Sequence, residues 1–489
     1  MLMRPIRRCL RKNPLPLQGE GWDGVALGQG DGSDASRNTH PHLNPPLEGG
    51  KPSSNPKRYT SEMSDTTITK VVGRRVWDSR GRPTVEAEVH LAGGAIGRAI
   101  APAGASTGSG EALDLRDGGE RLGGFDVRTA VDNVNLQIAD ALSGMDAADQ
   151  TLIDQSLIAL DGTPNKRVLG GNASIAASMA VLQAVAAAHR VPLWRYLTGK
   201  NEIVMPLPEI QIFGGGAHAG QRVDIQDFMV AAPGAENIDE ALEWTAEIYL
   251  AAGKLMAERG VLYGVADEGG FWPAFSTNEE ALEMLLRAIE KAKLIPNEQI
   301  VIALDVAASE FGKNGRYKIG LEKKDLDSDG MANMLGRWLE KYPIASIEDP
   351  LAEDDEAGLK KFTAAFGAKV QIVGDDYLVT NAERVKHAAK IGACNAVLIK
   401  PNQAGTITET HDAWRAAQGA GFGAIVSARS GETEDVIICH LAVGWGVKQI
   451  KVGSFSRSER MAKWNELLRI QSANTIKPPF AGWSPYRDL

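Results

Sequence analysis

The sequence predicts an α/β protein in which a smaller α+β domain precedes a (β/α)8-type barrel. Three observations lead to this prediction. Apolar, strand-like segments alternate with helical segments from about residue 206 onward, which is typical of parallel strands covered by helices. The region before them instead joins strands through a short turn and then becomes helical, as α+β domains do. A chain of 489 residues is also too long for one ordinary core.

Residues 1–62 form a separate N-terminal segment that is rich in proline and glycine and has no helical or strand period. The segment contains two similar pieces, LPLQGEG and NPPLEGG. Because it buries too little apolar surface to offset the entropy lost on ordering, we expect it to be disordered. Proline and glycine also interrupt the pattern of a secretory or transit peptide. We interpret Met63 as the biological start.

Residues 63–195 are predicted to form the α+β domain. Residues 67–78 and 83–91 alternate apolar and polar side chains around the turn-rich SRGR, so they predict a hairpin, and a third strand is expected near residues 95–101. The small residues of PAGASTG, 102–108, indicate a mobile loop. An alanine-rich run, 174–188, has helical spacing, with Asn172 as its candidate N-cap.

Residues 196–489 are predicted to form the barrel. Helical segments such as 239–259 and 278–292 lie between its strand-like segments. These segments end at Phe213, Asp305, Asp349, Asp376, Lys400, Ala428 and Gly453. A (β/α) barrel gathers the C-terminal ends of its strands on one face, so residues at these ends are the candidates for function.

Three carboxylates lie at or beside such strand ends: Asp305, Glu348 and Asp375. Buried parallel strands would bring them to one face. Grouped carboxylates repel one another unless a cation lies among them, and Mg²⁺ prefers such hard oxygen ligands. We therefore interpret them as a Mg²⁺ site. The alternative is that each acid caps the helix after its strand, but three successive strands argue against it.

Two lysines, Lys400 and Lys451, are expected at the same face, since one ends a strand and the other lies within the last strand. A second ammonium group and a divalent cation would lower a lysine's pKa, because like charge disfavours the protonated form. Such a lysine acts as a base near neutral pH. The alternative is a side chain that extends from a strand end to solvent.

Three further motifs carry candidate residues. SARSGETED, 427–435, follows a strand and opens a helix, so Arg429 and Ser430 beside free N–H groups predict a phosphate site, although ordinary helix capping has the same form. The glycine-rich 213–220 carries His218 without a nucleotide-binding spacing and is interpreted as a flexible lid. A loop histidine is more often structural or solvated. DEGG, 267–270, supplies Glu268 as a candidate proton donor.

Composition excludes several classes of partner. Asp and Glu number 62 against 53 Lys and Arg, and no basic stripe interleaved with aromatics occurs, so we expect a small-molecule substrate and no nucleic acid. Cys9, Cys394 and Cys439 form no C-x-x-C pattern, which fits a reducing compartment. No apolar run approaches the roughly 18 residues that cross a bilayer, so no membrane insertion is expected.

From about residue 67 to the C-terminus the chain closely resembles the enolase family. The resemblance rests on several motifs that occur in the family's order. They are DSRG (78–81), GASTG (104–108), DEGG (267–270), SIEDP (346–350), KPNQ (400–403), RSGETED (429–435) and RSER (457–460). The expected barrel is therefore of the enolase kind.

The resemblance implies a carbon–oxygen lyase of glycolysis and gluconeogenesis that interconverts 2-phosphoglycerate and phosphoenolpyruvate plus water. Lys400 would remove the C2 proton and Glu268 would assist loss of the C3 hydroxyl. Asp305, Glu348 and Asp375 would bind the tighter Mg²⁺, and Ser106 on the closing loop would help to bind a second. The residues expected to contact substrate are His218, Asp227, Glu348, Asp375, Arg429, Ser430 and Lys451. Among these, Arg429 and Ser430 would hold the phosphate and Lys451 the carboxylate.

The chain departs from the family pattern on the side of the leaving group and the lid. Ala428 stands where the family has a histidine, and Asp227 stands where it usually has Glu. A shift of one methylene costs roughly a hundredfold in rate at a sensitive position. Gly214, Ala217 and Ala103 replace the family's Asn, Ser and Ser. The metal ligands and the lysine base keep the pattern, so formation of the enolate is expected to be intact.

Three hypotheses follow for function. The first is an enolase acting on 2-phosphoglycerate. The second is an enolase-like paralogue that takes an α-proton from another phosphorylated hydroxy acid in a pocket enlarged at Ala428. The third is a non-catalytic binding protein that retains the fold. The resemblance also implies a homodimer or an octamer of dimers, a cytoplasmic location and a second role at the cell surface or outside the cell.

Overall fold

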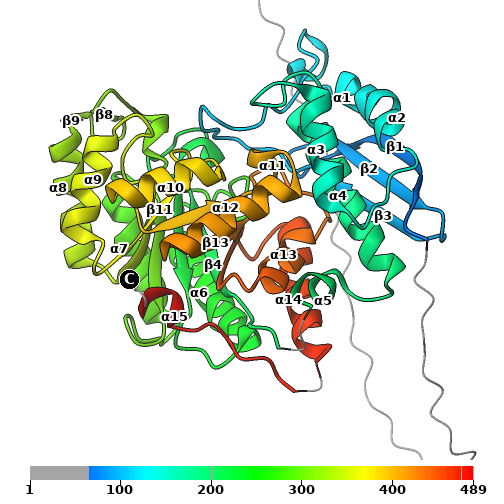
Figure 1. The fold of residues 1–489 in the computed structure, drawn as a ribbon. Coiled ribbons are helices and arrows are strands. Elements are labelled where there is room, and N and C mark those ends of the chain that lie inside the picture. Colours follow the sequence, from blue (N-terminus) through cyan, green and yellow to red (C-terminus); the bar gives the residue numbers. More distant parts are fainter. Residues whose placement is uncertain (1–64, 200–201, 475, 488–489) are drawn as a thin grey trace, which may run out of the picture. The chain divides into compact units, whose positions relative to one another are not determined.

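The computed structural model describes residues 65–199, 202–474 and 476–487. The predictions for residues 1–62, disorder and a start at Met63, lie outside these residues. The chain first forms a three-stranded sheet with helices and then a closed barrel (Figure 1). This arrangement confirms the predicted fold class.

The first sheet is antiparallel in the order β1-β2-β3. Strands β1 (Ile68–Trp77) and β2 (Pro83–Leu91) form the predicted hairpin, and β3 (Ile96–Ile100) pairs with β2. The helices that follow are η1 (Arg121–Gly124), α1 (Arg128–Asn133), η2 (Val134–Ile138), α2 (Ala139–Leu142), α3 (Gln150–Asp161), α4 (Gly171–Ala188) and α5 (Leu193–Thr198). The predicted domain boundary at residues 195 and 196 falls within α5 and stays a prediction.

Helix α4 packs its small side chains against β2 and β3. Gly97 of β3 lies so close that a Cβ there would collide with Ala180 and Ala184 of the helix, which is why a glycine fits in this strand. The helix starts before Asn172, so the prediction that Asn172 caps it is wrong; Gly170 is the N-cap, and the Asn172 amide contacts Leu115.

Helix α4 also corrects the expectation that no apolar stretch is long enough to cross a bilayer. Among the described residues it is the one helix long and apolar enough to cross a membrane, but 83% of its most apolar stretch is buried inside the protein. Its many alanines, with a few Ile, Met, Val and Leu residues between them, supply the apolar character without a run of large residues. It is placed as a core helix between the sheet and the barrel.

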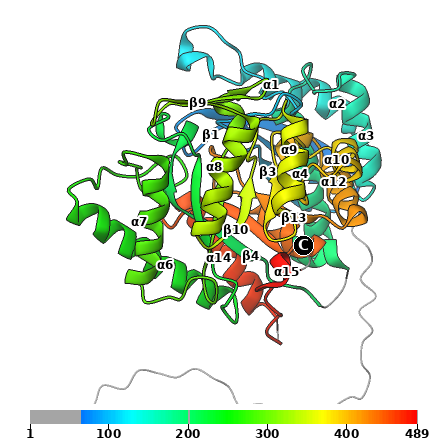
Figure 2. The same cartoon turned by 90° about the vertical axis from the view of Figure 1, so that its left-hand side faces the viewer.

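Eight strands close the barrel in the order β10-β11-β12-β13-β14-β4-β5-β6 (Figures 1 and 2). They are β4 (Leu207–Gly214), β5 (Asp227–Ala231), β6 (Val301–Asp305), β10 (Ile344–Glu348), β11 (Gln371–Gly374), β12 (Ala396–Ile399), β13 (Gly423–Ser427) and β14 (Gln449–Gly453). A small antiparallel sheet, β7 (Gly312–Lys313), β8 (Arg316–Ile319) and β9 (Lys324–Asp327), follows β6.

Helices cover the outside of the barrel. They are α6 (Ile238–Glu258), α7 (Asn278–Lys291), α8 (Ser328–Lys341), α9 (Glu356–Phe366), α10 (Ala382–Ile391), α11 (Pro401–Ala404), α12 (Ile407–Ala420), α13 (Ile437–Trp445), α14 (Ser458–Ser472) and α15 (Ser484–Arg487), with 3-10 turns η3 (Gly216–Ala219) and η4 (Ala308–Glu310) in the loops. Several start at a side-chain cap, such as Thr277 before α7, whose side chain accepts from Glu280 N.

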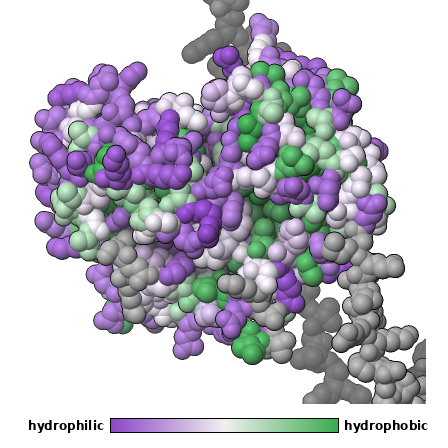
Figure 3. Space-filling model, viewed as in Figure 1, coloured by the Kyte–Doolittle hydropathy of each residue, from purple (hydrophilic) through white to green (hydrophobic). Residues whose placement is uncertain are grey.

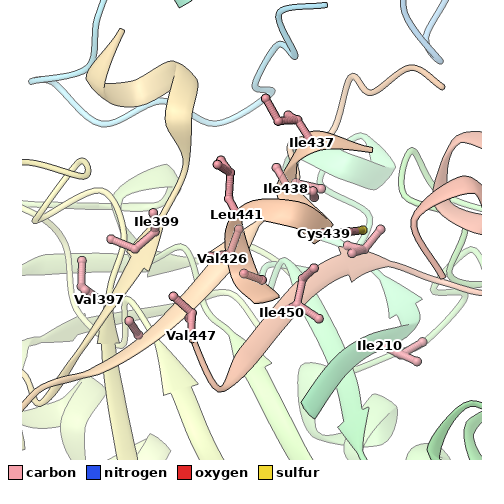
Figure 4. Packing of buried hydrophobic residues seen from close by; sticks show 14 of the residues in the cluster. Ile210, Val397, Ile399, Val426, Ile437, Ile438, Cys439, Leu441, Val447 and Ile450 are labelled. Atoms are coloured by element: carbon pink, nitrogen blue, oxygen red, sulfur yellow. The ribbon is translucent and has the colours of Figure 1, made fainter. Parts of the chain in front are cut away.

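The strands bury apolar residues outward against these helices. Figure 4 shows Cys439 and Leu441 of α13 beside Val426 of β13 and Ile450 of β14, all buried. Residues on either side of Ile450 face the barrel interior instead, because successive side chains of a strand alternate. The barrel core therefore has an apolar outer layer and an interior whose residues are free to be polar.

One strand differs from the prediction of a wholly parallel barrel. Strand β5 pairs antiparallel with both β4 and β6. The loop of residues 215–226 turns the chain back directly after β4, so no covering helix separates the two strands. No strand was predicted at residues 227–231, and the expectation of an all-parallel barrel was wrong at β5.

The surface carries its apolar side chains unevenly. On the face shown in Figure 3, hydrophilic side chains predominate over α8, α9 and α10, and apolar ones gather over the helices of the first domain. Leu136, Leu152 and Val168 of that region are exposed.

Candidate active site

The candidate site lies at the mouth of the barrel, where the strands β6, β10, β11, β12 and β14 end. Asp305 and Glu348 are the last residues of β6 and β10 and lie opposite each other in the pairing register. Asp375 directly follows β11 and Lys400 directly follows β12. Because neighbouring parallel strands end together, these side chains reach one place, and all of them are buried.

Asp227 reaches the same mouth from the start of its strand. It is the first residue of β5 and pairs with Asp305 of β6. Only the antiparallel direction of β5 puts a strand start at this end. Asp227 is completely buried.

A single cavity brings most of the predicted residues together. Nine of them line it, and so does Ala428. The lining consists of Ser106, His218, Gln226, Asp227, Glu268, Asp305, Lys400, Ser427, Ala428, Arg429, Ser430 and Lys451. The two other predicted residues, Glu348 and Asp375, hydrogen bond to Lys451 and Lys400.

The two lysines are held by carboxylates. Lys451 Nζ lies 2.8 Å from Asp305 Oδ2, 2.8 Å from Glu348 Oε2 and 3.3 Å from Asp227 Oδ2. Lys400 Nζ donates to Asp375 Oδ2. The site thus pairs two ammonium groups with four carboxylates in a buried space.

In the protein alone, the pKa of Lys400 is raised, and its predicted lowering by a second ammonium group and a divalent cation stays a prediction. Burial alone would lower the pKa of Lys400, but the carboxylates of Asp375 and Glu348 raise it above the usual value, against the smaller effect of Arg429 and Lys451. The sequence argument counted a second ammonium group and a divalent cation, and it did not foresee that Asp375 contacts Lys400 directly. Contact at hydrogen-bond distance outweighs charge that lies farther away.

Excess negative charge and unsatisfied oxygens mark where a cation fits. Burial and the charge of Asp305 raise the pKa of Glu348 well above its usual value. Three buried oxygens at the mouth, Glu348 Oε1, Asp227 Oδ2 and Gln226 Oε1, have no hydrogen-bond partner. Carboxylate and amide oxygens are ligands of hard divalent cations. The donor set therefore fits a Mg²⁺-like ion.

The residues whose ligand atoms lie closest together differ from the predicted set of metal ligands. In the described part of the chain, two groups have ligand atoms within 4.8 Å of one another: His218, Asp227 and Glu268, and Asp349, Asp375 and Asp376. The predicted set of Asp305, Glu348 and Asp375 is not such a group, since Lys451 Nζ lies between the first two.

His218 is at the centre of a hydrogen-bonded chain. Its Nδ1 lies 3.0 Å from Asp227 Oδ1, and its Nε2 lies 2.9 Å from Ser430 Oγ and 3.6 Å from Glu268 Oε1. Burial alone would lower the pKa of His218, but Asp227 and Glu268 raise it. His218 is buried, so context gives this loop histidine a fixed place.

Arg429 joins the loop of Ser106 to the barrel. Its Nη1 lies 2.9 Å from Glu111 Oε2, and its Nη2 donates to the carbonyl of Ser106 at 2.9 Å. Arg460 in turn donates to the carbonyls of Arg429 and Ser430, at 2.8 and 2.6 Å. A buried guanidinium and hydroxyl side by side form an anion-binding pair.

The predicted helix start behind this pair is wrong. Strand β13 ends at Ser427, and α13 begins only at Ile437. Asp435 lies just before this helix, where its two carboxylate oxygens accept from Ile437 N at 2.8 Å and from Ile100 N at 2.9 Å. Any anion at Arg429 and Ser430 is therefore bound in a loop and not at a helix N-terminus.

Several residues of the site were missed by the sequence argument. Glu111 pairs with Arg429, Gln226 Nε2 donates to Asp305 Oδ2 at 3.0 Å, and Gln403 Nε2 donates to Asp375 Oδ1 at 2.8 Å. Gln211 donates to Asp227. The sequence did carry a signal for Gln211. Glu209 and Gln211 are two polar residues two positions apart in the otherwise apolar strand β4, so both point to the same side.

Comparison with protein-family models gives two matches. Residues 68–197 match the model described as the enolase N-terminal domain, and residues 202–488 match the enolase C-terminal TIM barrel domain. The second match alone covers more than half of the chain. The two matches meet close to the end of α5.

Proposed function

Because this chain belongs to the enolase family, we propose that it is the lyase that interconverts 2-phosphoglycerate and phosphoenolpyruvate plus water, as a step of glycolysis and gluconeogenesis. The observation that carries the proposal is the buried mouth in which Lys400, several carboxylates and Arg429 meet. A phosphorylated small acid needs this combination of a base, a cation site and an anion-binding pair.

The divalent cation of the proposal is Mg²⁺, held by Asp305, Glu348 and Asp375, with Ser106 reaching a second ion. When bound, the cation supplies positive charge beside the substrate carboxylate, where a second negative charge develops as the neighbouring proton leaves. The unsatisfied Glu348 Oε1 supports this assignment.

Lys400 Nζ is proposed as the base that takes the proton from C2. Asp375 holds a proton on Lys400, so Lys400 must first release that proton to water. A cation bound at Asp375 would favour this release, because positive charge disfavours the protonated lysine. The electron pair of the C–H bond then passes to the substrate carboxylate. Lys451 lies across the mouth and stabilises that carboxylate by its charge.

Glu268 is proposed to donate the proton with which the C3 hydroxyl leaves as water. The electron pair returns from the carboxylate, forms the C2–C3 double bond and breaks the C3–O bond. His218 lies 3.6 Å from Glu268 Oε1, close enough to orient it. Arg429 and Ser430 are proposed to hold the phosphate, in keeping with their burial beside the cavity.

A coupled assay tests the proposal. Purified protein with saturating Mg²⁺ is expected to form phosphoenolpyruvate from 2-phosphoglycerate, and the Lys400→Ala variant is expected to lose roughly 10²–10⁴-fold in rate, the usual contribution of a general base. Formation of product no faster than by Lys400→Ala would reject the proposal.

A second candidate function rests on Ala428. Its small side chain lines the cavity beside Arg429 and Ser430, where a ring would otherwise fill space. A different phosphorylated hydroxy acid would fit there, and Mg²⁺-dependent exchange of its α-proton with solvent would distinguish this function. A non-catalytic binding role would instead show in a protein that exchanges no α-proton and binds no Mg²⁺.

Assembly and location remain proposals from family resemblance. We propose a homodimer or an octamer built from dimers, in the cytoplasm, with a second role at the cell surface or outside the cell. Light scattering on the purified protein measures the first, and a monomer at micromolar concentration would reject it. Cell fractionation measures the second.

A further inference from the structure

Gln211 connects two parts of the site that are otherwise separate. Its side chain is completely buried in β4. Its Nε2 donates to Asp227 Oδ1, and its Oε1 accepts from Gly270 N at 2.8 Å. Gly270 belongs to the loop that carries Glu268. One amide group therefore bonds both to Asp227 and to the Glu268 loop.

Two glycines make room for this amide. A Cβ on Gly270 would lie 2.6 Å from Gln211 Oε1, and a Cβ on Gly214 would lie 3.1 Å from both amide atoms of Gln211. Gly214 is one of the positions where the chain departs from the family's Asn, and Asp227 is another, where the side chain is one methylene shorter. A Cβ on Gly214 would also lie 2.6 Å from Ala266 Cβ. Gln211 thus lies against Gly214 and bonds to Asp227.

We propose that Gln211 is a positioning residue: it spans the distance that the short side chain of Asp227 leaves open and fixes Asp227 against His218. The proposal rests on the proposed function, since it concerns the groups around the leaving hydroxyl.

The hydrogen bonds give the reason. Asp227 Oδ1 accepts from Gln211 Nε2 and faces His218 Nδ1 at 3.0 Å. An acceptor at this place keeps the proton on Nδ1 and turns Nε2 toward Ser430 and Glu268. With Gln211 removed, the hydrogen bond to His218 and the ion pair with Lys451 are the contacts that hold the Asp227 carboxylate, and it is free to turn toward the lysine.

The test exchanges the lengths of the two side chains. Gln211→Asn shortens one by a methylene and Asp227→Glu lengthens the other, so the double variant restores the combined length. We expect each single variant to lose roughly tenfold to a hundredfold in kcat with a smaller change in KM, as for a misplacement of about 1 Å. The double variant is expected to recover most of the loss. Losses that simply add in the double variant would overturn the proposal.

A second readout does not depend on turnover. The imidazole nitrogens of His218 are observed by ¹⁵N NMR at a pH high enough to leave the ring neutral, since Asp227 and Glu268 raise its pKa. They are expected to show a proton fixed on Nδ1 in the wild type and the double variant, and a mixture of tautomers in Gln211→Asn. The same spectrum in all three proteins would overturn the proposal. This outcome is separate from a failure of the proposed function, which would remove turnover of 2-phosphoglycerate and leave the spectra as expected.

The Gln211→Met variant is the control for loss of folding in the other variants. Methionine has nearly the volume of glutamine but donates no hydrogen bond, so the fold is expected to persist while the His218 tautomer and kcat change as in Gln211→Asn. Wild-type kcat and spectrum in Gln211→Met would show that Gln211 only fills space, and would contradict the proposal.

Discussion

Two layers of the barrel interior differ in how their polar groups are paired. The mouth holds Glu348 and Lys451. Ser346 and Gln449 lie two residues earlier on the same two strands, β10 and β14. Together with Glu209 of β4 and Gln371 of β11, they form what we call the lower layer. Residues two apart in a strand face the same side. The two layers therefore lie on the same strands and are both buried, but their polar side chains are paired differently.

The lower layer is a closed hydrogen-bonded set. Gln371 Nε2 donates a hydrogen bond to Gln449 Oε1 at 2.8 Å, and Gln449 Nε2 donates one to Gln371 Oε1 at 3.0 Å. Ser346 Oγ donates to Gln371 Oε1 at 3.1 Å, and Gln449 Nε2 donates to Glu209 Oε1 at 2.9 Å. None of these four side chains has a buried polar atom without a hydrogen-bond partner, whereas three oxygens at the mouth do lack one.

The difference teaches that pairing, and not polarity, separates a structural layer from a functional one. Satisfied neutral groups rigidify a core, and unsatisfied charged groups lower stability unless a ligand completes them. The mouth keeps the charges that a cation and an anionic substrate would satisfy. Substitutions in each layer should therefore respond differently to Mg²⁺ and to pH.

The largest effect is expected for Lys451→Met at the mouth. The change leaves Asp305, Glu348 and Asp227 without their shared ammonium group, and breaking a buried ion pair costs about 3–5 kcal/mol of unfolding free energy. Chemical denaturation should show this loss in Mg²⁺-free buffer and a partial recovery with millimolar Mg²⁺. Lys341→Met, at an exposed lysine that bridges Glu279 and Glu283, is the matched control. An equal loss in both variants would remove the distinction between mouth and surface.

The next effect is a dependence on pH in the lower layer. Burial raises the pKa of Glu209 to about 7 from the usual 4.5, so folding favours its neutral form. The stability that this provides is complete below pH 4.5 and is lost as the pH rises through 7. Glu209→Gln should therefore raise the unfolding free energy at pH 8 by about 3 kcal/mol more than at pH 4. A gain that is the same at both pH values would contradict the assignment.

The smallest effect concerns the C-terminal helix α15. Tyr486 Oη donates to Glu209 Oε1 at 3.3 Å, and Tyr486→Phe removes this bond at a cost of about 1 kcal/mol. Urea denaturation at neutral pH measures it. Tyr263→Phe, at a residue that is 68% exposed, should leave the midpoint unchanged, and the assay for turnover should not distinguish either variant from wild type.

Strand ends and helices were predictable from local pattern. Asp305 and Glu348 end their strands as expected because apolar, β-branched runs followed by acids are visible in the sequence. The hairpin of β1 and β2 followed from the alternation on either side of SRGR. Such features depend on a few neighbouring residues, and local pattern determines them.

Other features depend on contacts between distant segments. The direction of β5 is set by its partners β4 and β6, and no residue within β5 encodes it. The sign of the Lys400 pKa shift depends on Asp375, which lies 25 positions away. Asp435, just before α13, accepts a hydrogen bond from Ile100 N, 335 positions earlier in the chain. None of these contacts has a signature in sequence spacing.

The central claim is that carboxylates from separate strands bind one divalent cation at the mouth. A calorimetric titration with Mg²⁺ tests it most directly on three proteins: wild type, Glu348→Gln and Glu209→Gln. We predict that wild type and Glu209→Gln bind the ion equally, and that Glu348→Gln binds it at least tenfold more weakly. Equal binding by wild type and Glu348→Gln, or no binding by wild type, would contradict the account.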